Sequence, residues 1–172
     1  RAVYGDAGAF GGDIASNLMY AEFLTKNGRE KYSVEQMGYG YRTSVFKRGE
    51  IHAIVLSALL RLKNSVKEEV SVKIEQFSER RKATQPPGAS MGSMFKNPAG
   101  DFAGRLIEAA GLKGTRIGNA EISTVHGNFF INHGETKAED IRALIHLVQN
   151  TVREKFNVQL DLEVELVGDW NL

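Results

Sequence analysis

Residues 86–98 read PPGASMGSMFKNP, and the rest of the chain is organised around this stretch. Its prolines and glycines favour an irregular loop, and a hydroxyl, an ammonium and a carboxamide follow at Ser93, Lys96 and Asn97. Gly92 lets the backbone come close to a ligand. Lysine and asparagine side chains suit a phosphate or a carboxylate. These residues indicate either a binding loop or a plain loop that leads into a helix.

Bulk composition excludes several classes of protein. A length of 172 residues, 42% apolar and 25% charged, suits one large or two small soluble domains. Because 22 basic residues nearly balance 21 acidic ones, we expect no nucleic-acid partner. No apolar run reaches membrane-spanning length, no signal peptide is visible, and the four histidines lack metal-ligand spacing. The absence of cysteine excludes disulfides and thiol catalysis and fits a cytoplasmic location.

The first third of the chain is rich in glycine and turn signals. Residues 5–12 read GDAGAFGG, which lacks the spacing of a nucleotide-binding loop and indicates either a turn or a close approach to a ligand. Asn27-Gly28 predicts a hairpin between residues 19–25 and 30–34. Arg42 lies among aromatic and hydroxyl residues in the sequence. It is either a surface residue or an arginine whose guanidinium binds a carboxylate. Residues 51–62 are almost wholly apolar and predict a buried strand.

Helical patterns dominate the remainder. A capping box at Ser65–Glu68 predicts a helix through Lys82, with Val66, Val70, Ile74 and Phe77 on one face. We expect a second helix that starts near Phe102 and stops at Gly111, then loops over 112–128 and a short buried strand over 129–131.

The last part of the chain predicts a helix and a strand. A capping box at 136–139 and an apolar stripe from Ile141 to Phe156 predict a third helix closed by Asn157. Strict alternation over 158–166 predicts a strand with Asp161, Glu163 and Glu165 on its polar face. The pattern does not choose which of these carboxylates would line a cleft.

Five motifs occur in the order seen in one enzyme family: GAFGG at 8–12, YRTS at 41–44, GSMFKNP at 92–98, AGRLIE at 103–108 and HGNF at 126–129. With them the chain resembles the UDP-N-acetylenolpyruvoylglucosamine reductases over essentially its whole length. It is similar to their compact form, which lacks a tyrosine-bearing insertion.

The resemblance implies a flavoenzyme of peptidoglycan precursor synthesis, and so of cell wall biogenesis, cell shape and cell division. NADPH reduces bound FAD, and hydride then passes to the enolpyruvyl ether of the UDP-sugar. Among the matching positions, Ser93 would donate a proton, while Arg42 and Glu163 would assist at the substrate carboxylate.

Binding residues follow from the same motifs. Lys96, Asn97, His126 and Asn128 would bind the UDP-sugar, and Gly8 and Ala9 with Arg42 would bind the cofactor. The guanidinium of Arg42 would stabilise the negative charge that hydride addition places on the substrate carboxylate.

The resemblance also implies an organisation. We expect an α+β fold: residues 1–63 as the trailing part of a flavin-binding domain with antiparallel strands, and residues 64–172 as the UDP-sugar-binding domain. The family's first flavin-binding lobe has no counterpart in these residues. The chain starts within the segment that follows that lobe, where Arg1 and Asp6 replace the glycine and the asparagine that are usual in the family. We therefore expect weak FAD binding and an inactive fragment. A non-catalytic nucleotide-sugar-binding domain is the alternative. The oligomeric state is left open.

Overall fold

The computed structural model describes residues 2–170, so the Arg1 substitution lies outside the described residues. It confirms a mixed α/β fold with antiparallel sheets and divides into two compact units, the first ending at Ile74 and the second starting at Glu75. This division falls within a helix, whereas the sequence places the domain boundary just before it. None of the helices in residues 2–170 is both long and apolar enough to cross a bilayer.

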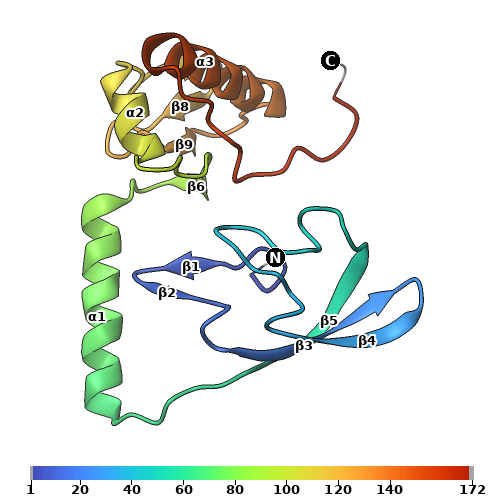
Figure 1. The fold of residues 1–172 in the computed structure, drawn as a ribbon. Helices are drawn as coiled ribbons and strands as arrows, with labels where there is room; N and C mark the ends of the chain where they lie inside the picture. Colours follow the sequence, from blue (N-terminus) through green and yellow to red (C-terminus); the bar gives the residue numbers. More distant parts are fainter. Residues whose placement is uncertain (1, 171–172) are drawn as a thin grey trace. The chain divides into compact units, whose positions relative to one another are not determined.

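The first unit contains a two-stranded ribbon and a three-stranded sheet (Figure 1). The ribbon pairs β1 (Gly8–Ala9) with β2 (Gly12–Asp13). The sheet has the order β4-β3-β5, built from β3 (Leu18–Thr25), β4 (Gly28–Ser33) and β5 (Ala53–Leu60). The predicted hairpin is confirmed, with Gly28 at φ +105°. Phe23 stacks on Phe46 at 3.9 Å in the core of this unit.

The apolar strand β5 is not buried as expected. It pairs with β3, and only Ala53 and Val55 on one face pack against the core of the first unit. On the other face Ile54 is 65% exposed. The apolar run therefore forms a strand without forming a core.

Helix α1 (Lys67–Thr84) also lacks the buried face that its spacing predicts. None of its residues is buried, and Ile74 is 61% exposed. The Ser65 hydroxyl bonds the Glu69 carboxylate at 2.5 Å and not that of Glu68. The predicted helix is confirmed, but its apolar packing face and its cap are wrong for residues 2–170.

The second unit packs two helices on a four-stranded antiparallel sheet of order β6-β9-β8-β7. The strands are β6 (Ala89–Ser93), β7 (Arg116–Ile117), β8 (Ala120–Ile122) and β9 (Phe129–Asn132), and the helices are α2 (Ala103–Ala109) and α3 (Ala138–Phe156). The buried strand at 129–131 is confirmed. The loop predicted over 112–128 is partly wrong, because β7 and β8 form a hairpin there around Gly118 and Asn119.

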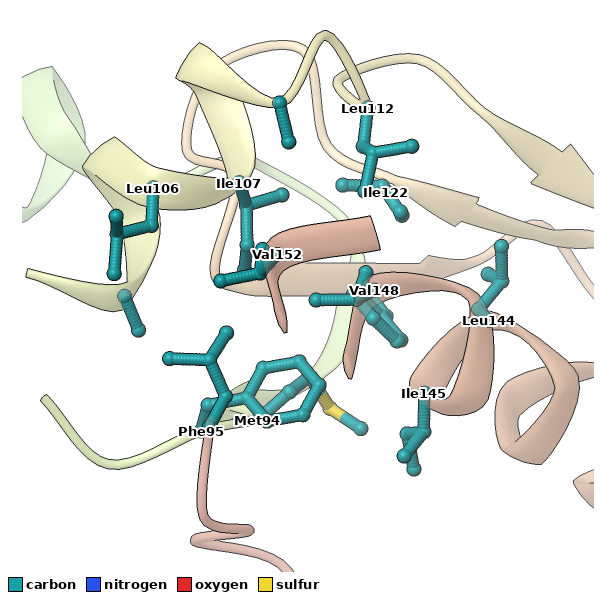
Figure 2. Close-up of a cluster of buried hydrophobic side chains, with 14 of the residues drawn as sticks. Met94, Phe95, Leu106, Ile107, Leu112, Ile122, Leu144, Ile145, Val148 and Val152 are labelled. Atoms are coloured by element: carbon teal, nitrogen blue, oxygen red, sulfur yellow. The ribbon is translucent and has the colours of Figure 1, made fainter. Parts of the chain in front are cut away.

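Figure 2 shows the core of this unit, where side chains of α2, α3 and residues 94–95 point toward one another. The predicted stripe of α3 supplies Leu144, Ile145, Val148 and Val152 to it. The helix begins after Lys137, whose N–H bonds the Asp140 carboxylate, so the predicted cap at Thr136 is wrong by one residue.

Asn157 ends α3, as predicted, and takes the left-handed conformation there (φ 54°).

The chain after α3 does not form the predicted strand. It makes one isolated bridge, between Phe95 and Leu162. Leu160 is fully buried and Val164 packs against the same core, so the predicted alternation holds as far as Val164, whereas Leu166 is 41% exposed.

Candidate active site

The central loop begins where β6 ends. Gly92 takes φ +81°, and the pairing of β6 with β9 is irregular between Ser90 and Ser93. A left-handed residue just before Ser93 lets the strand turn out of the sheet at that point. Ser93 is therefore held at the sheet by its partner Phe129 while the chain beyond it leaves the strand.

A pocket of about 420 Å³ opens beside this loop in the second unit. It brings together four predicted site residues, Ser93, Asn97, His126 and Asn128. The pocket is also lined by Phe102, Gly104, Arg105, Glu108, Val125 and Gly127. Lys96 and Glu163 are not among the lining residues.

Asn97 connects the loop to α2. Its side-chain oxygen accepts a hydrogen bond from the Ala103 N–H at 3.1 Å. Phe102 precedes the helix and provides no side-chain acceptor. Because the first N–H groups of a helix need partners, Asn97 fixes where α2 begins.

His126 lies against α2 in a restricted orientation. Its Nδ1 accepts the Asn128 N–H at 3.2 Å, and its ring meets the Phe129 ring edge-on at 4.9 Å. Burial lowers the pKa of His126 below its ordinary value. An Nδ1 that accepts a bond leaves the proton of the neutral ring on Nε2. A neutral imidazole with an Nε2–H donor is therefore the form at physiological pH.

Asn128 is 3% exposed and its amide bonds the loop backbone. Its Oδ1 accepts the Phe95 N–H at 2.9 Å, and its Nδ2 donates to the Phe95 carbonyl at 2.8 Å. Its own carbonyl accepts the Met94 N–H at 2.9 Å. The side-chain amide and the backbone carbonyl of Asn128 are thus both bonded to residues 94 and 95.

The chain after α3 borders the other side of the same loop. The Lys96 N–H donates to the Asp161 carbonyl at 2.8 Å, and the Glu163 N–H donates to the Met94 carbonyl at 2.9 Å. The backbone of Glu163 is therefore bonded to Met94, the residue that follows Ser93.

The remaining predicted residues lie in the first unit. Arg42 has φ 58° and donates to the carbonyls of Asp6 (3.2 Å) and Gly8 (2.6 Å). A Cβ on Gly8 would lie 3.0 Å from Nη1 of Arg42. The glycine at position 8 thus leaves room for the guanidinium beside the β1–β2 ribbon, which brings the three predicted cofactor residues, Gly8, Ala9 and Arg42, together.

Sequence reasoning missed Arg105 and Glu108 as pocket residues. They are three residues apart on α2 and share a face of the helix. Nε of Arg105 bonds the Asp101 carboxylate at 2.6 Å, and this interaction lowers the pKa of Asp101 to about 2. Helical spacing from Phe102 was the signal that could have found them.

The pocket can bind a polar ligand through a hydroxyl, an imidazole N–H and a guanidinium. Within residues 2–170 no three His, Cys, Asp or Glu side chains gather where a metal ion could be held.

Comparison with known proteins identifies the family. Residues 83–167 match the model for the C-terminal domain of UDP-N-acetylenolpyruvoylglucosamine reductase. The reductase of Chloroflexus aggregans is 47% identical over 171 residues, which is 96% of this chain and 57% of the relative. A sequence of the same name from Bacillus licheniformis is 39% identical over 170 residues and is 92% covered.

A solved structure agrees with these relatives. The crystal structure of the Thermus caldophilus UDP-N-acetylenolpyruvylglucosamine reductase superposes with a TM-score of 0.82 at 39% identity, covering 95% of this chain and 58% of that one. The chain spans little more than half the length of several relatives that it matches. On these matches, the chain belongs to the UDP-N-acetylenolpyruvoylglucosamine reductase family.

Proposed function

We propose that this chain forms part of an enzyme that reduces UDP-N-acetylenolpyruvoylglucosamine to UDP-N-acetylmuramate for peptidoglycan synthesis in the bacterial cytoplasm. One observation carries the proposal. A single pocket collects Ser93, Asn97, His126 and Asn128, which come from two separate motifs of the family resemblance. Membership of the family supports the reaction class.

The first unit has groups that fit part of a flavin. A Cβ built on Gly11 would meet no atom within 4 Å, and one on Gly12 would meet none closer than 3.8 Å, so the ribbon is open to close approach. The Arg42 guanidinium adds a positive charge beside this ribbon. Bound FAD, reduced by NADPH, would supply the hydride. Gly8 and Ala9 would present backbone to it, and Arg42 would orient it.

Ser93 is the proposed proton donor. A serine hydroxyl is a weak acid, so it can protonate only a strongly basic carbon that lies within hydrogen-bond reach. Hydride addition to the enolpyruvyl ether makes such a carbon next to the carboxylate. Arg42 would stabilise the negative charge on that carboxylate, and Glu163 would orient its neighbours.

The UDP-sugar would occupy the pocket of the second unit. His126 Nε2–H and the Asn97 amide can donate to diphosphate or sugar oxygens, and Lys96 would add a cation near the diphosphate. Arg105 provides a guanidinium on the wall formed by α2.

The test is Ser93→Ala in the enzyme expressed from its complete gene. We expect NADPH-driven flavin reduction to proceed at the unchanged rate, while reduction of the enolpyruvyl substrate falls at least about a hundredfold. Stopped-flow absorbance at the flavin bands measures both half-reactions. Ser90→Ala, on the same strand and exposed, is the matched control.

Equal loss in both half-reactions would remove the proton-donor role from Ser93. UDP-sugar binding without any NADPH oxidation by the unmutated protein would instead support a non-catalytic nucleotide-sugar-binding domain.

A further inference from the structure

We infer that Asn128 is a positioning residue that sets Ser93 and Glu163 through the backbone of residues 94 and 95, and is not a direct ligand of the UDP-sugar. This inference rests on the proposed function of the pocket. It differs from the role that the family resemblance implies for Asn128, which is substrate binding.

The first step is the commitment of the Asn128 amide. Both of its polar atoms bond the Phe95 backbone, at 2.9 and 2.8 Å, and the residue is 3% exposed. A side chain this buried offers a ligand little surface. A carboxamide that pairs with both the N–H and the C=O of one residue acts as a neighbouring strand would, and so holds that residue in an extended conformation.

The second observation concerns the opposite edge of residues 94 and 95. Met94 and Phe95 are 0% and 1% exposed, and their backbone also pairs with residues 161–163. Residues 94 and 95 are therefore paired on both edges, with Asn128 on one side and the chain that carries Glu163 on the other. Ser93 immediately precedes these two residues, and the Glu163 N–H donates to the carbonyl of the first of them, Met94.

The third step is the energetic consequence. Displacement of a reacting group by about 1 Å can cost about a hundredfold in rate. Asparagine is needed because Phe95 presents one donor and one acceptor. An aspartate at 128 could accept from the Phe95 N–H, but its second oxygen would face the Phe95 carbonyl oxygen. We expect Asn128→Asp to shift the backbone of residues 94 and 95 and to move Ser93 and Glu163 with it.

The experiment measures Asn128→Asp, Ser93→Ala and the double variant in the enzyme expressed from its complete gene. We expect Asn128→Asp to lower kcat about ten- to a hundredfold with KM for the UDP-sugar changed less than about threefold. In the Ser93→Ala background the same change should cost clearly less than in the wild type, because the part that acts through Ser93 is already lost and only the part that acts through Glu163 remains. Asn132→Asp is the control, since its side chain only accepts a local bond from the Gly134 N–H.

A raised KM with unchanged kcat would make Asn128 a direct ligand and overturn the inference. So would a full additional loss in the Ser93→Ala background, or unchanged kinetics.

A second measurement needs no variant. Hydrogen exchange of the Met94 and Phe95 amides in the 172-residue chain should be at least about a thousandfold slower than in an unfolded peptide. Exchange at the unprotected rate would overturn the inference even if Asn128→Asp does not fold. Protected amides together with no turnover by the unmutated enzyme would reject the proposed function and leave the Asn128 contact in place.

Discussion

At the residue scale, Arg42 combines a strained backbone with a fixed side chain. Its φ of 58° is unusual for a residue other than glycine, asparagine or aspartate, and its guanidinium bonds two carbonyls of the glycine-rich segment. Backbone strain of this kind often accompanies functional sites. Position 42 therefore requires the arginine fork and not merely a positive charge.

Replacement of Arg42 by lysine tests that requirement. We expect Arg42→Lys to lower the rate of enolpyruvyl reduction about 10²- to 10³-fold, on the scale of losing one donor at a developing anion. Steady-state NADPH oxidation measures the rate. Arg48→Lys is the control, because Arg48 is an exposed arginine of the same unit that also bonds a carbonyl. A wild-type rate for Arg42→Lys would contradict the assignment.

We expect His126 to make stability depend on pH. Its folded-state pKa is lowered, first by burial, so between that value and about 6.5 the unfolded chain binds more protons than the folded one. The free energy of unfolding should therefore fall as pH drops through this window.

Urea unfolding between pH 7.5 and 5 measures the effect. His126→Gln should flatten this pH dependence, and His52→Gln, at an exposed position, should leave it as in the wild type. A flattening by His52→Gln alone would show that His126 is not the group responsible.

At the element scale, α2 depends on a glycine. A Cβ on Gly104 would lie 2.8 Å from Cε1 of His126, whose ring is already held by Asn128 and Phe129. Alanine normally stabilises a helix interior over glycine by about 0.5–1 kcal/mol. Overpacking of this kind costs about 1–3 kcal/mol, so the clash should exceed the gain.

We therefore expect Gly104→Ala to lower the free energy of unfolding by about 1–2 kcal/mol and to weaken UDP-sugar binding. Thermal unfolding and calorimetry measure the two effects. Gly12→Ala, with no atom nearer than 3.8 Å to the added Cβ, is the control for adding a methyl group. An increase in Tm for Gly104→Ala would show that His126 can move aside.

Elements were predictable where pattern and packing agree. The hairpin at Asn27-Gly28 and the stripe of α3 have local signals that tertiary structure supports. The apolar faces of β5 and α1 were misjudged, because spacing shows that a face is apolar but not whether anything covers it. The hairpin at Gly118-Asn119 had a turn signal that the surrounding glycines obscured.

The candidate site was predictable as a list of residues and not as a set of roles. Motif order identified Ser93, Asn97, His126 and Asn128, which the pocket brings together. It could not show that the Asn128 amide faces Phe95, since that depends on contacts between segments 33 residues apart. Arg105 was missed because its cation reads in sequence as an ordinary exposed helix residue.

At the scale of the whole molecule, the two units carry different parts of the proposed reaction. The joint action of Ser93, Arg42 and Glu163 on one substrate stays a prediction, because Arg42 belongs to the first unit and the other two belong to the second. Each unit has its own buried cluster.

Ligand binding to the 172-residue chain tests this division. We expect it to bind UDP and the UDP-sugar through the second unit but to lose FAD on gel filtration, because the first unit offers only a short ribbon and Arg42 to a flavin. Calorimetry with UDP and absorbance in the flavin bands measure the two affinities. A chain that stays yellow without binding UDP would reverse the assignment.

The contact between the chain after α3 and residues 94–96 limits where insertions and deletions can be tolerated. The chain after α3 meets residues 94–96 through one bridge, which consists of two backbone hydrogen bonds, so its alignment depends on the number of residues that follow Asn157. Loss of one residue there would put Glu163 where Leu162 now packs and turn the carboxylate into the apolar core. Natural variation in length should therefore be tolerated beyond Leu166 but not between Asn157 and Glu163.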